Sequence, residues 1–500
     1  RLPFPFATPL DVTAAAPGEF MFETGTWVAN GSASLTITLN TPSFGTPIAI
    51  FVRMVGQAAA PSAGSFAGGV RASLGFGTRR GGATQSGCVG EGVDDNVATS
   101  ATARVRNTTL LVVPSNGGGG IDYTVSLDSF GSGSFSVSYS SAANASGDFF
   151  EYAVWGGTQL TDAIVLNWTM DSTGATEVVT GTGFLPSVMM ALDCDSALTS
   201  TLLGAALGFG CASSASRFWS LAAAASEGDV GTGTMNWNRA IRTDALLERL
   251  SINDDTTVAR WDLNSFDADG ATMGVVDAPA AVDRICPLLF IQGGVWEAGT
   301  FTKQAGTGDQ QVTLANAALT PVGAILGMTG QTAVGLDLGQ FNLCIGAGST
   351  ANPTRGSAVN NCVGIVGPEN INTTADRFRA TDSIIEELTG GTTPAETSEA
   401  WLDAMAQGSF TIDWATNGGS AALVGYLAFG AAAGAAVEDP IAQMRTRRPA
   451  SPGHRAFAIA HDLSDIVAAP TAEGGEEVQV PLASRLPPPP RRAALPTQHL

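Results

Sequence analysis

The segment DADG, which begins at Asp267, has the residue types of a calcium-binding loop. Alternating carboxylates before a glycine can ligate a hard cation, and the surrounding sequence is NSFDADGATMGV. The spacing does not complete that site, because a loop counted from Ser265 places Val276 where a bidentate glutamate should stand. The alternative is a hairpin turn in which Gly270 adopts a positive φ.

Histidine chemistry is excluded from most of the chain. The three histidines are His454, His461 and His499, and all of them follow residue 435. Residues 1–435 therefore contain no Ser-His-Asp or Cys-His triad and no histidine-based hydrolytic metal site. The sequence also lacks a Walker loop and an H-E-x-x-H motif. We predict that the protein is not an enzyme and has no catalytic residue, cofactor or metal.

Two pairs of carboxylates have the residue types of a glycosidase acid and base. Asp193 and Asp195 flank Cys194, and Glu386 is followed directly by Glu387. On so acidic a protein, the interpretation that we favour is that both pairs lie in solvated acidic loops.

Glycines at 75 and 77 resemble part of a dinucleotide-binding fingerprint. The third glycine and the helix that should follow are missing, so we expect these glycines to reflect β-strand geometry.

The six cysteines do not form a recognisable redox or zinc motif. None belongs to a C-x-x-C sequence, and none has zinc-ligand spacing to a histidine. Cys194–Cys211 and Cys344–Cys362 are candidate disulfide pairs, although their spacings differ. We favour small buried thiols for the full set, which is Cys88, Cys194, Cys211, Cys286, Cys344 and Cys362.

The composition favours a β-rich protein without affinity for nucleic acid. Of 500 residues, 61 are glycine and only 14% are charged, which is typical of β architecture with many turns. The formal net charge is −21, whereas a surface that binds nucleic acid needs clustered lysine and arginine. Lys303 is the only lysine. No run of about 18 apolar residues is present, so we expect no membrane insertion.

Internal repetition is the strongest signal in the sequence. Three landmarks recur in the same order, 133 to 139 positions apart. A proline-led strand appears as TPIAIF from Thr46, LPSVMM from Leu185 and TPVGAI from Thr320. A glycine-rich strand appears as SLGFGT, ALGFGC and CIGAGS, with leading glycines at 75, 208 and 346. An apolar final strand appears as YAVWGG, LFIQGG and YLAFGA, which begin at residues 152, 289 and 426.

Comparison of the copies decides the DADG question in favour of the turn. The corresponding stretches are SLDSFGSGSFSVSY (126–139) and WLDAMAQGSFTIDW (401–414). Both retain a glycine and an alternating apolar strand but not the carboxylates. We therefore predict a β-hairpin whose glycine supplies the positive φ.

A further match joins the second and third copies without gaps. NRAIRTDALLERL (238–250) aligns with DRFRATDSIIEEL (376–388), and both keep an arginine and an aspartate, Arg239/Arg377 and Asp244/Asp382. Taken alone, these segments could be amphipathic helices, but the first copy ends in a strand-like LLVV, so we favour a strand with an adjoining loop. We expect the arginine and the aspartate to form a structural ion pair.

These patterns predict an all-β fold of three tandem antiparallel β-sandwich modules that are jelly-roll-like. We predict an N-terminal extension at 1–18, module 1 at 19–157, module 2 at 158–294 and module 3 at 295–435. Residues 436–500 should form an extended C-terminal arm, rich in proline and arginine, with one short helix. Its RLPPPPRR stretch is typical of polyproline II, and we expect the arm to dock on a neighbouring subunit.

Residues 19–431 resemble a repeat found in virion proteins of tailed bacteriophages. The resemblance rests on GTFTKQAGTGDQQVT (299–313), TPVGAILGMTGQTA (320–333), NSFDADGATMGV (264–275) and YLAFGA (426–431). It implies a non-enzymatic structural component of the virion, such as a tail, fibre, decoration or capsid-surface protein. The implied partners are copies of the chain itself and other virion proteins, and the implied location is the particle surface.

The alternative function is a carbohydrate-binding adhesin or a secreted cell-surface β-repeat protein. An adhesin would recognise a host surface glycan, with exposed Trp155, Trp168 or Trp237 as stacking platforms. The competing interpretation, which we favour, places these tryptophans in the core or at an interface. A third class, a glycan-degrading enzyme, would need a cleft lined by paired carboxylates.

Overall fold

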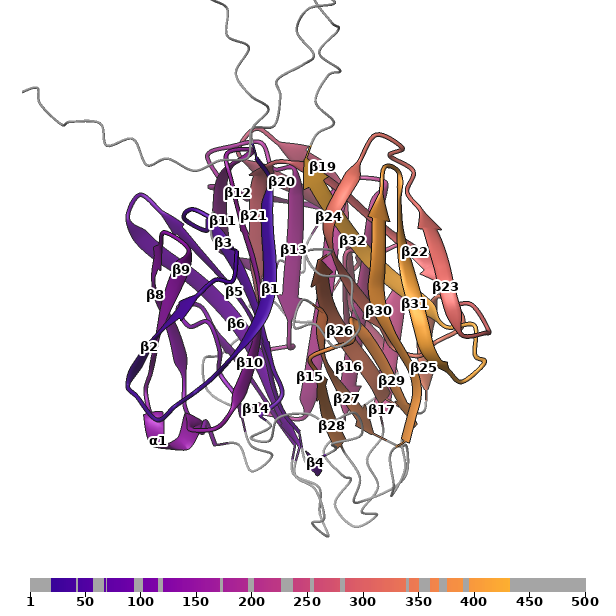
Figure 1. Ribbon diagram of the computed structural model, residues 1–500, viewed down its shortest axis with the longest axis horizontal. Helices are drawn as coiled ribbons and strands as arrows, with labels where there is room; N and C mark the ends of the chain where they lie inside the picture. Colours follow the sequence, from indigo (N-terminus) through magenta and orange to yellow (C-terminus); the bar gives the residue numbers. More distant parts are fainter. Residues whose placement is uncertain are drawn as a thin grey trace, which may run out of the picture. The chain divides into compact units, whose positions relative to one another are not determined.

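The computed structural model confirms the predicted all-β fold. It describes residues 19–41, 44–56, 67–68, 70–93, 102–115, 120–170, 174–196, 202–225, 237–251, 256–278, 284–338, 341–349, 360–367, 376–389 and 395–431. Within these ranges one short helix, α1 (Ala142–Ala145), accompanies the strands, which are all antiparallel (Figure 1). The predicted N-terminal extension and C-terminal arm lie outside the described residues.

Each copy of the repeat supplies most of one seven-stranded sheet and one smaller sheet. In module 1 the large sheet has the order β1 (Met21–Val28), β10 (Phe149–Gly156), β3 (Ala49–Met54), β5 (Val70–Arg80), β6 (Ala83–Val93), β7 (Thr102–Asn107) and β14 (Leu202–Leu203). Its small sheet has the order β2 (Ser34–Thr38), β9 (Ser134–Tyr139) and β8 (Val125–Gly131).

Module 2 repeats this arrangement. Its large sheet has the order β11 (Leu160–Met170), β21 (Arg284–Gly293), β13 (Val188–Asp193), β15 (Ala205–Ser214), β16 (Arg217–Ala225), β17 (Trp237–Arg242) and β25 (Gly335–Leu338). Its small sheet has the order β12 (Thr176–Thr180), β20 (Gly270–Asp277), β19 (Thr257–Asp267) and β18 (Leu247–Leu250).

Module 3 has the same plan. Its large sheet has the order β22 (Val295–Thr302), β32 (Leu423–Ala431), β24 (Thr320–Met328), β26 (Phe341–Ser349), β27 (Asn360–Gly367), β28 (Asp376–Ala380) and β4 (Ala67–Gly68). Its small sheet has the order β23 (Gly308–Thr313), β31 (Ser409–Asn417), β30 (Ala395–Ala406) and β29 (Ile385–Thr389).

The last strand of every large sheet comes from a different module. In each module the segment between the third strand and the glycine-rich strand supplies this strand. Module 2 gives β14 to module 1, module 3 gives β25 to module 2, and module 1 gives β4 to module 3. The exchange is therefore cyclic, and it ties all three modules together.

The hydrophobic pattern of each strand follows the layer in which it lies. In the small sheets, burial alternates with period two, as in β9, where the aromatic and valine side chains point inward and the serines outward. In the large sheets, β3 and β13 are buried at every position. Both faces of these strands are covered, because the large sheet lies between its own small sheet and the other modules, and their residues are apolar except for Arg53 in β3 and Asp193 in β13.

The predicted hairpins are confirmed in all three modules. Strands β8–β9, β19–β20 and β30–β31 pair directly across short turns. The loop glycines Gly133 and Gly408 have φ values of 64° and 74°, and Gly270, which follows the loop of module 2 and begins β20, has a φ of 141°. Residues with side chains rarely adopt these values. The DADG segment is thus a turn.

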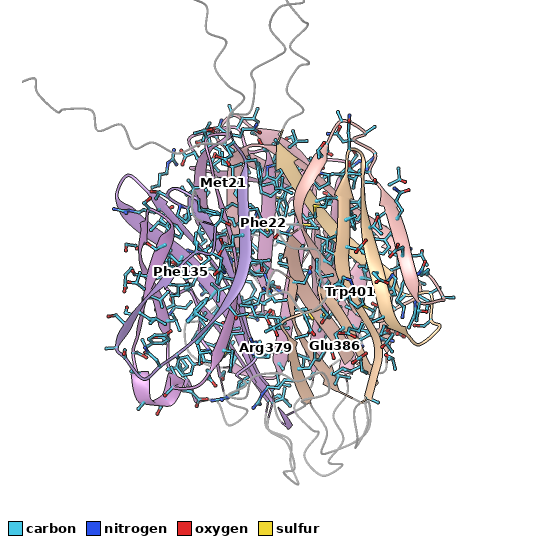
Figure 2. All side chains as sticks on the ribbon, in the orientation of Figure 1. Met21, Phe22, Phe135, Arg379, Glu386 and Trp401 are labelled. Carbon is cyan, nitrogen blue, oxygen red and sulfur yellow. The ribbon has the colours of Figure 1, made fainter. Side chains whose placement is uncertain are left out.

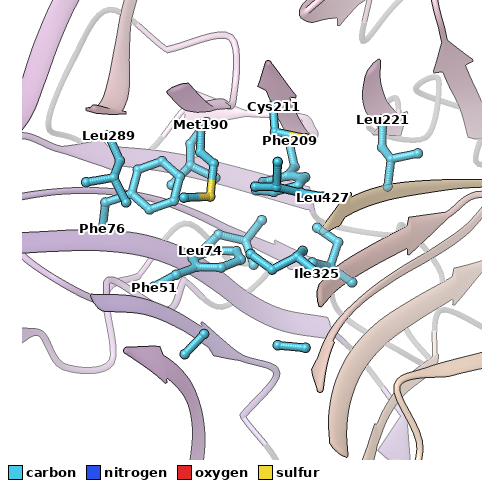
Figure 3. Packing of buried hydrophobic residues seen from close by; sticks show 14 of the residues in the cluster. Phe51, Leu74, Phe76, Met190, Phe209, Cys211, Leu221, Leu289, Ile325 and Leu427 are labelled. Atoms are coloured by element: carbon cyan, nitrogen blue, oxygen red, sulfur yellow. The ribbon is translucent and has the colours of Figure 1, made fainter. Parts of the chain in front are cut away.

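The interior has two kinds of core. Each sandwich encloses its own cluster between its large and small sheets. A further cluster is shared by all three modules and lies on the opposite faces of the large sheets. Figure 3 shows Phe51 of module 1, Phe209 of module 2 and Leu427 of module 3 in this shared core. The rings of Phe51 and Phe209 stack with centroids 5.4 Å apart.

Strand pairing also tests how the sequence copies align. The proline-led strands are equivalent as predicted, since Phe51, Met190 and Ile325 pair with Phe76, Cys211 and Ala347 respectively. The predicted glycine alignment of the second copy is wrong by two positions. Gly75 and Gly346 correspond to Gly210, not to residue 208. The final strand of that copy is likewise displaced by one position, because Leu288 corresponds to Tyr152 and Tyr426.

Each of the three corresponding glycines lets another backbone segment of its own module pass close to it. A Cβ on Gly75, Gly210 or Gly346 would lie 1.7–1.8 Å from the carbonyl oxygen of Leu111, Leu246 or Ile384. No side chain fits there. The glycine pattern at residues 75–77 is therefore strand geometry, as expected, and not part of a nucleotide site.

Candidate functional site

The most informative sites in the described part of the chain are the three interfaces between modules. Each interface uses equivalent strand positions, because Phe76, Cys211 and Ala347 pair with Gly87, Trp219 and Asn361. The last three of these residues, Gly87, Trp219 and Asn361, are equivalent in position but differ greatly in size and polarity. The interfaces are consequently built from different chemistry on one backbone plan.

The interface between modules 2 and 3 is filled by an indole. Trp219 is fully buried and packs over two glycines of module 3, and a Cβ on Gly425 would lie 2.3 Å from its ring. A Cβ on Gly327 would lie 3.0 Å from the same ring. The indole Nε1 donates a hydrogen bond of 2.6 Å to the carbonyl of Tyr426, which satisfies its polar atom.

The interface between modules 1 and 2 is narrower at the equivalent point. Gly87 faces Asn167 and Pro287, and a Cβ on Gly87 would lie 2.8 Å from both side chains. Asn167 Nδ2 donates to the carbonyl of Thr108 at 3.1 Å. At the end of β5, the Arg80 guanidinium pairs with Asp162 at 3.1 Å.

The interface between modules 3 and 1 is ionic. We call Arg53, Glu151, Asn361 and Arg379 the closing cluster, because no covalent link joins module 3 directly to module 1 along the described chain. The Glu151 carboxylate lies 3.7 Å from Arg53 and 3.4 Å from Arg379. Arg53 Nη2 donates to Asn361 Oδ1, and Asn361 Nδ2 donates to Thr24 Oγ1 at 2.7 Å. Arg379 is labelled in Figure 2.

The expectation that Asp193 lies in a solvated loop is wrong. Asp193 is 2% exposed, and Arg249 donates two hydrogen bonds to its carboxylate, from Nε at 2.7 Å and from Nη2 at 2.8 Å. Burial alone would raise the pKa of this carboxyl, but the charge and hydrogen bonds of Arg249 outweigh it and lower the pKa. Asp193 is therefore an ionised carboxylate with its charge compensated.

The partner carboxylate, Asp195, joins two modules. Its oxygens lie 3.0 Å from Arg284, 3.3 Å from Arg249 and 3.4 Å from Arg104 of module 1. Its backbone φ is 50°, the only positive value at a non-glycine residue among those described. The expected solvated loop is thus replaced by a three-arginine junction, because the guanidinium groups come from strands far away in the sequence.

Glycine occupies the position of Asp195 in the other two modules. Gly56 has a φ of 56° and Gly330 a φ of 71°. Aspartate tolerates this left-handed conformation better than most residues, yet it is less favourable there than glycine. Module 2 thus has an aspartate at a position where glycine would be more favourable. The ion pairs of Asp195 with three arginines account for the aspartate. A water-sized cavity of about 10 Å³ adjoins the junction and is lined by Asp193, Asp195, Glu248 and Arg249 among others.

The second carboxylate pair is also buried, which corrects the same expectation. Glu387 accepts a hydrogen bond of 2.8 Å from Lys303, whose ammonium group is fully buried. Glu386 is 4% exposed and stands directly opposite Glu399 in the neighbouring strand. Burial first, and then the charges of Glu396, Glu399 and Asp382, raise the pKa of Glu386 to about 8. Figure 2 marks its position in module 3.

The expected ion pair between Arg239 and Asp244 is not formed. Arg239 instead pairs with Asp337 on the exchanged strand β25, at 2.7 Å and 3.0 Å, and donates to the Thr329 carbonyl. Asp244 meets Arg260 at 3.5 Å on the surface. The segment itself is a strand and a loop, as predicted, followed by a further strand. Arg239 thus binds the exchanged strand β25 through Asp337.

Trp155, Trp168 and the cysteines lie where the favoured interpretations place them. Trp155 is fully buried and Trp168 is 7% exposed, so neither is a stacking platform. The side chain of Trp237 lies outside the described residues. All six cysteines are buried and free, so the candidate pairs Cys194–Cys211 and Cys344–Cys362 do not form.

Both carboxylates of the DADG segment accept hydrogen bonds from protein groups, and that of Asp269 accepts one from the backbone N–H of Gly183. Asp267 accepts hydrogen bonds from the Ser265 and Thr272 hydroxyls at 2.8 Å and 2.7 Å. The ranges that the structure describes contain no group of three or more histidine, cysteine or acidic residues suited to a metal ion. They also contain no helix that is long and apolar enough to cross a membrane.

Sequence reasoning missed the closing cluster and the exchanged strands. Arg53 and Glu151 are isolated charges within apolar strands, FVRMV and FEYAV, and that pattern is the one signal that could have found them. The exchanged strands β14 and β4 have two residues each, which is too short for any hydrophobic period.

Comparisons with known proteins add little to this description. No protein-family model matches the sequence, and no curated protein matches it. Among solved structures, the LG1-3 region of the laminin alpha2 chain is similar at 8% identity and a TM-score of 0.08. The match covers 81% of this chain and 97% of that one, and a TM-score so low carries no argument about fold or function.

Proposed function

We propose that the chain is a non-enzymatic structural component of a tailed-phage virion, such as a tail, fibre, decoration or capsid-surface protein. The observation that carries the proposal is the cyclic exchange of β14, β25 and β4 around a shared core. This construction makes one durable block out of three similar β-modules. The repeat resemblance to virion proteins supports the same conclusion.

Such a block offers several surfaces for assembly. The small sheets begin with β2, β12 and β23, and within the described residues each of these strands pairs on one side only. An open strand edge can add a strand from a neighbour through main-chain hydrogen bonds. Copies of the chain and other virion proteins are the partners that we propose, together with docking of the arm at 436–500 on a neighbouring subunit.

The proposal is tested on particles rather than on the isolated chain. Mass spectrometry of purified virions should detect the protein in stoichiometric amount, and cryo-EM should locate three-module density at the particle surface. A chain without residues 436–500 should fold but should be depleted from particles. Recovery of the full chain from the soluble cell fraction alone would contradict a structural role.

The adhesin alternative has lost support from two of its three tryptophans. Trp155 and Trp168 belong to the cores, where no sugar can stack on them. The buried carboxylate pairs likewise contact arginine and lysine side chains or other carboxylates, and do not line an open cleft. The geometry therefore favours a structural role over glycan recognition.

A further inference from the structure

The closing cluster buries more positive than negative charge. Arg53 and Glu151 are completely buried and Arg379 is 3% exposed. Two guanidinium groups thus share one carboxylate. Removing an uncompensated charge from water costs several kcal/mol, so a stable interface needs a further negative or strongly accepting group here.

The hydrogen bonds of the cluster are equally incomplete. The buried atoms without a hydrogen-bond partner include Nε and Nη1 of Arg53, both carboxylate oxygens of Glu151, and all three guanidinium nitrogens of Arg379. The two ion-pair distances of 3.7 Å and 3.4 Å exceed the roughly 2.7–2.9 Å of a charge-assisted hydrogen bond. In native interiors, groups of this kind are satisfied by ordered water or a bound ion.

Elsewhere the same fold satisfies an equally buried arginine completely. Arg249 is 2% exposed, and its Nε and Nη2 both bind Asp193 within 2.8 Å. Buried atoms without a hydrogen-bond partner also occur singly elsewhere, as at Glu91 and Asn238. In the closing cluster, however, three neighbouring charged side chains have such atoms together.

Among the described residues, no further hydrogen-bond acceptor reaches the unpartnered guanidinium nitrogens of the closing cluster. The oxygen of Asn361 already accepts from Arg53 Nη2. The Arg379 guanidinium lies 3.9 Å from the centre of the Phe149 ring, and that of Arg53 lies 5.2 Å from the centre of the Phe51 ring. The thiols of Cys344 and Cys362 and the carboxyl of Glu386 are the other titratable groups that act on the cluster.

We propose that the closing cluster binds one small monovalent anion, a halide or an anion of similar size, between the guanidinium groups of Arg53 and Arg379. Above the pKa of Glu151, where its carboxyl group is ionised, one negative charge added to Arg53, Arg379 and Glu151 makes the cluster neutral. The anion also accepts the N–H groups that have no partner. A divalent oxyanion would leave the cluster negative and would cost more to desolvate. This inference concerns the stability of the block and is independent of its place in a particle.

Thermal unfolding in two salts tests the proposal. In sodium chloride, Tm should rise linearly with the logarithm of chloride concentration, whereas in sodium gluconate of equal ionic strength it should stay flat. Arg379→Gln should abolish the difference between the salts. Arg239→Gln is the matched control, because Arg239 lies at another interface and has a carboxylate partner, and it should keep the difference. Equal melting in both salts, or a chloride response that survives in Arg379→Gln, would overturn the proposal.

A second measurement does not depend on any variant. Crystals of the full chain grown or soaked in sodium bromide should show anomalous density between Arg53 and Arg379. Water molecules alone at that position, without anomalous signal, would exclude the anion.

Discussion

Trp219 of module 2 occupies the space that Gly425 of module 3 leaves open, and its indole nitrogen donates to the next residue's carbonyl at 2.6 Å. The corresponding position is Gly87 in module 1 and Asn361 in module 3. A module could not be exchanged for another without placing an indole against Glu151 or Pro287. The three interfaces therefore enforce one order of modules around the block.

We predict that Gly425→Ala destabilises the protein by overpacking. The new Cβ would lie 2.3 Å from the Trp219 ring, and such insertions cost about 1–3 kcal/mol. Urea unfolding measures the change in free energy. Trp219→Ala alone should cost about 3–5 kcal/mol, and the double variant should cost less than the sum of the two.

Gly306→Ala is the control for that pair of variants. Nothing lies within 4 Å of a Cβ at Gly306, and its φ is not in the left-handed region. Its stability should change by no more than about 0.5 kcal/mol. Strict additivity of Gly425→Ala and Trp219→Ala would show that the two residues do not share one space.

We predict that Asp195→Gly destabilises the protein although glycine suits the local backbone. The change relieves the unfavourable φ but leaves Arg104, Arg249 and Arg284 with fewer acceptors, and breaking a buried pair costs about 3–5 kcal/mol. Chemical unfolding should show a clear net loss. By contrast, Asp244→Asn affects an exposed pair and should change stability by less than about 1 kcal/mol. A stabilised Asp195→Gly would show that the junction contributes nothing.

We predict that the protein is more stable at pH 5 than at pH 9. Burial raises the pKa of Glu91 to about 8 and that of Glu151 to about 7, and burial with neighbouring carboxylates raises the pKa of Glu386 to about 8. The unfolded chain releases these protons near pH 4.3, so between that pH and about 8 the folded state binds more protons. Stability therefore falls as pH rises through this window.

Denaturant unfolding at pH 5, 7 and 9 measures this dependence. Glu91→Gln and Glu386→Gln should each reduce the loss between pH 5 and 9, because glutamine needs no proton to remain neutral. Asp309→Asn alters an exposed carboxylate and should leave the slope unchanged. A stability that rises from pH 5 to pH 9 would contradict the assigned directions.

We predict that residues 19–157 alone do not form a stable monomer. The isolated module would expose its part of the shared core, including Phe51, Phe76 and Trp155, and would lose the strand β14 that covers β7. Size-exclusion chromatography and circular dichroism should show aggregation or self-association and no sharp thermal transition. A cooperatively folding monomer would mean that the modules are independent domains.

Much of the fold could be predicted from the sequence because strand patterns are local. Alternation in SFSVSY, the proline-led strands and the turn glycines each depend on a few neighbouring residues. The glycine alignment failed where the second copy offers Gly208 and Gly210 on one strand. Only the pairing of β15 with β13 shows that Gly210, and not Gly208, is the glycine that lies against the Leu246 carbonyl.

The site could not be predicted in the same way because its contacts are long-range. Asp195 looks like a surface carboxylate until Arg104 and Arg284 reach it from positions 91 and 89 residues away. Lys303 and Glu387 are 84 residues apart. Burial of a charge depends on such distant partners, and no local composition reveals them.

Two short joints, one near Gly157 and one at Gly294, link three mutually contacting bodies. These links keep module 3 close to module 1, and the effective concentration of module 3 at the surface of module 1 is on the order of millimolar or higher. A ring of three separate chains would come apart on dilution, whereas this one stays closed even when a single molecule is released alone. Because the three modules belong to one chain, closure of the block does not depend on the concentration of the protein.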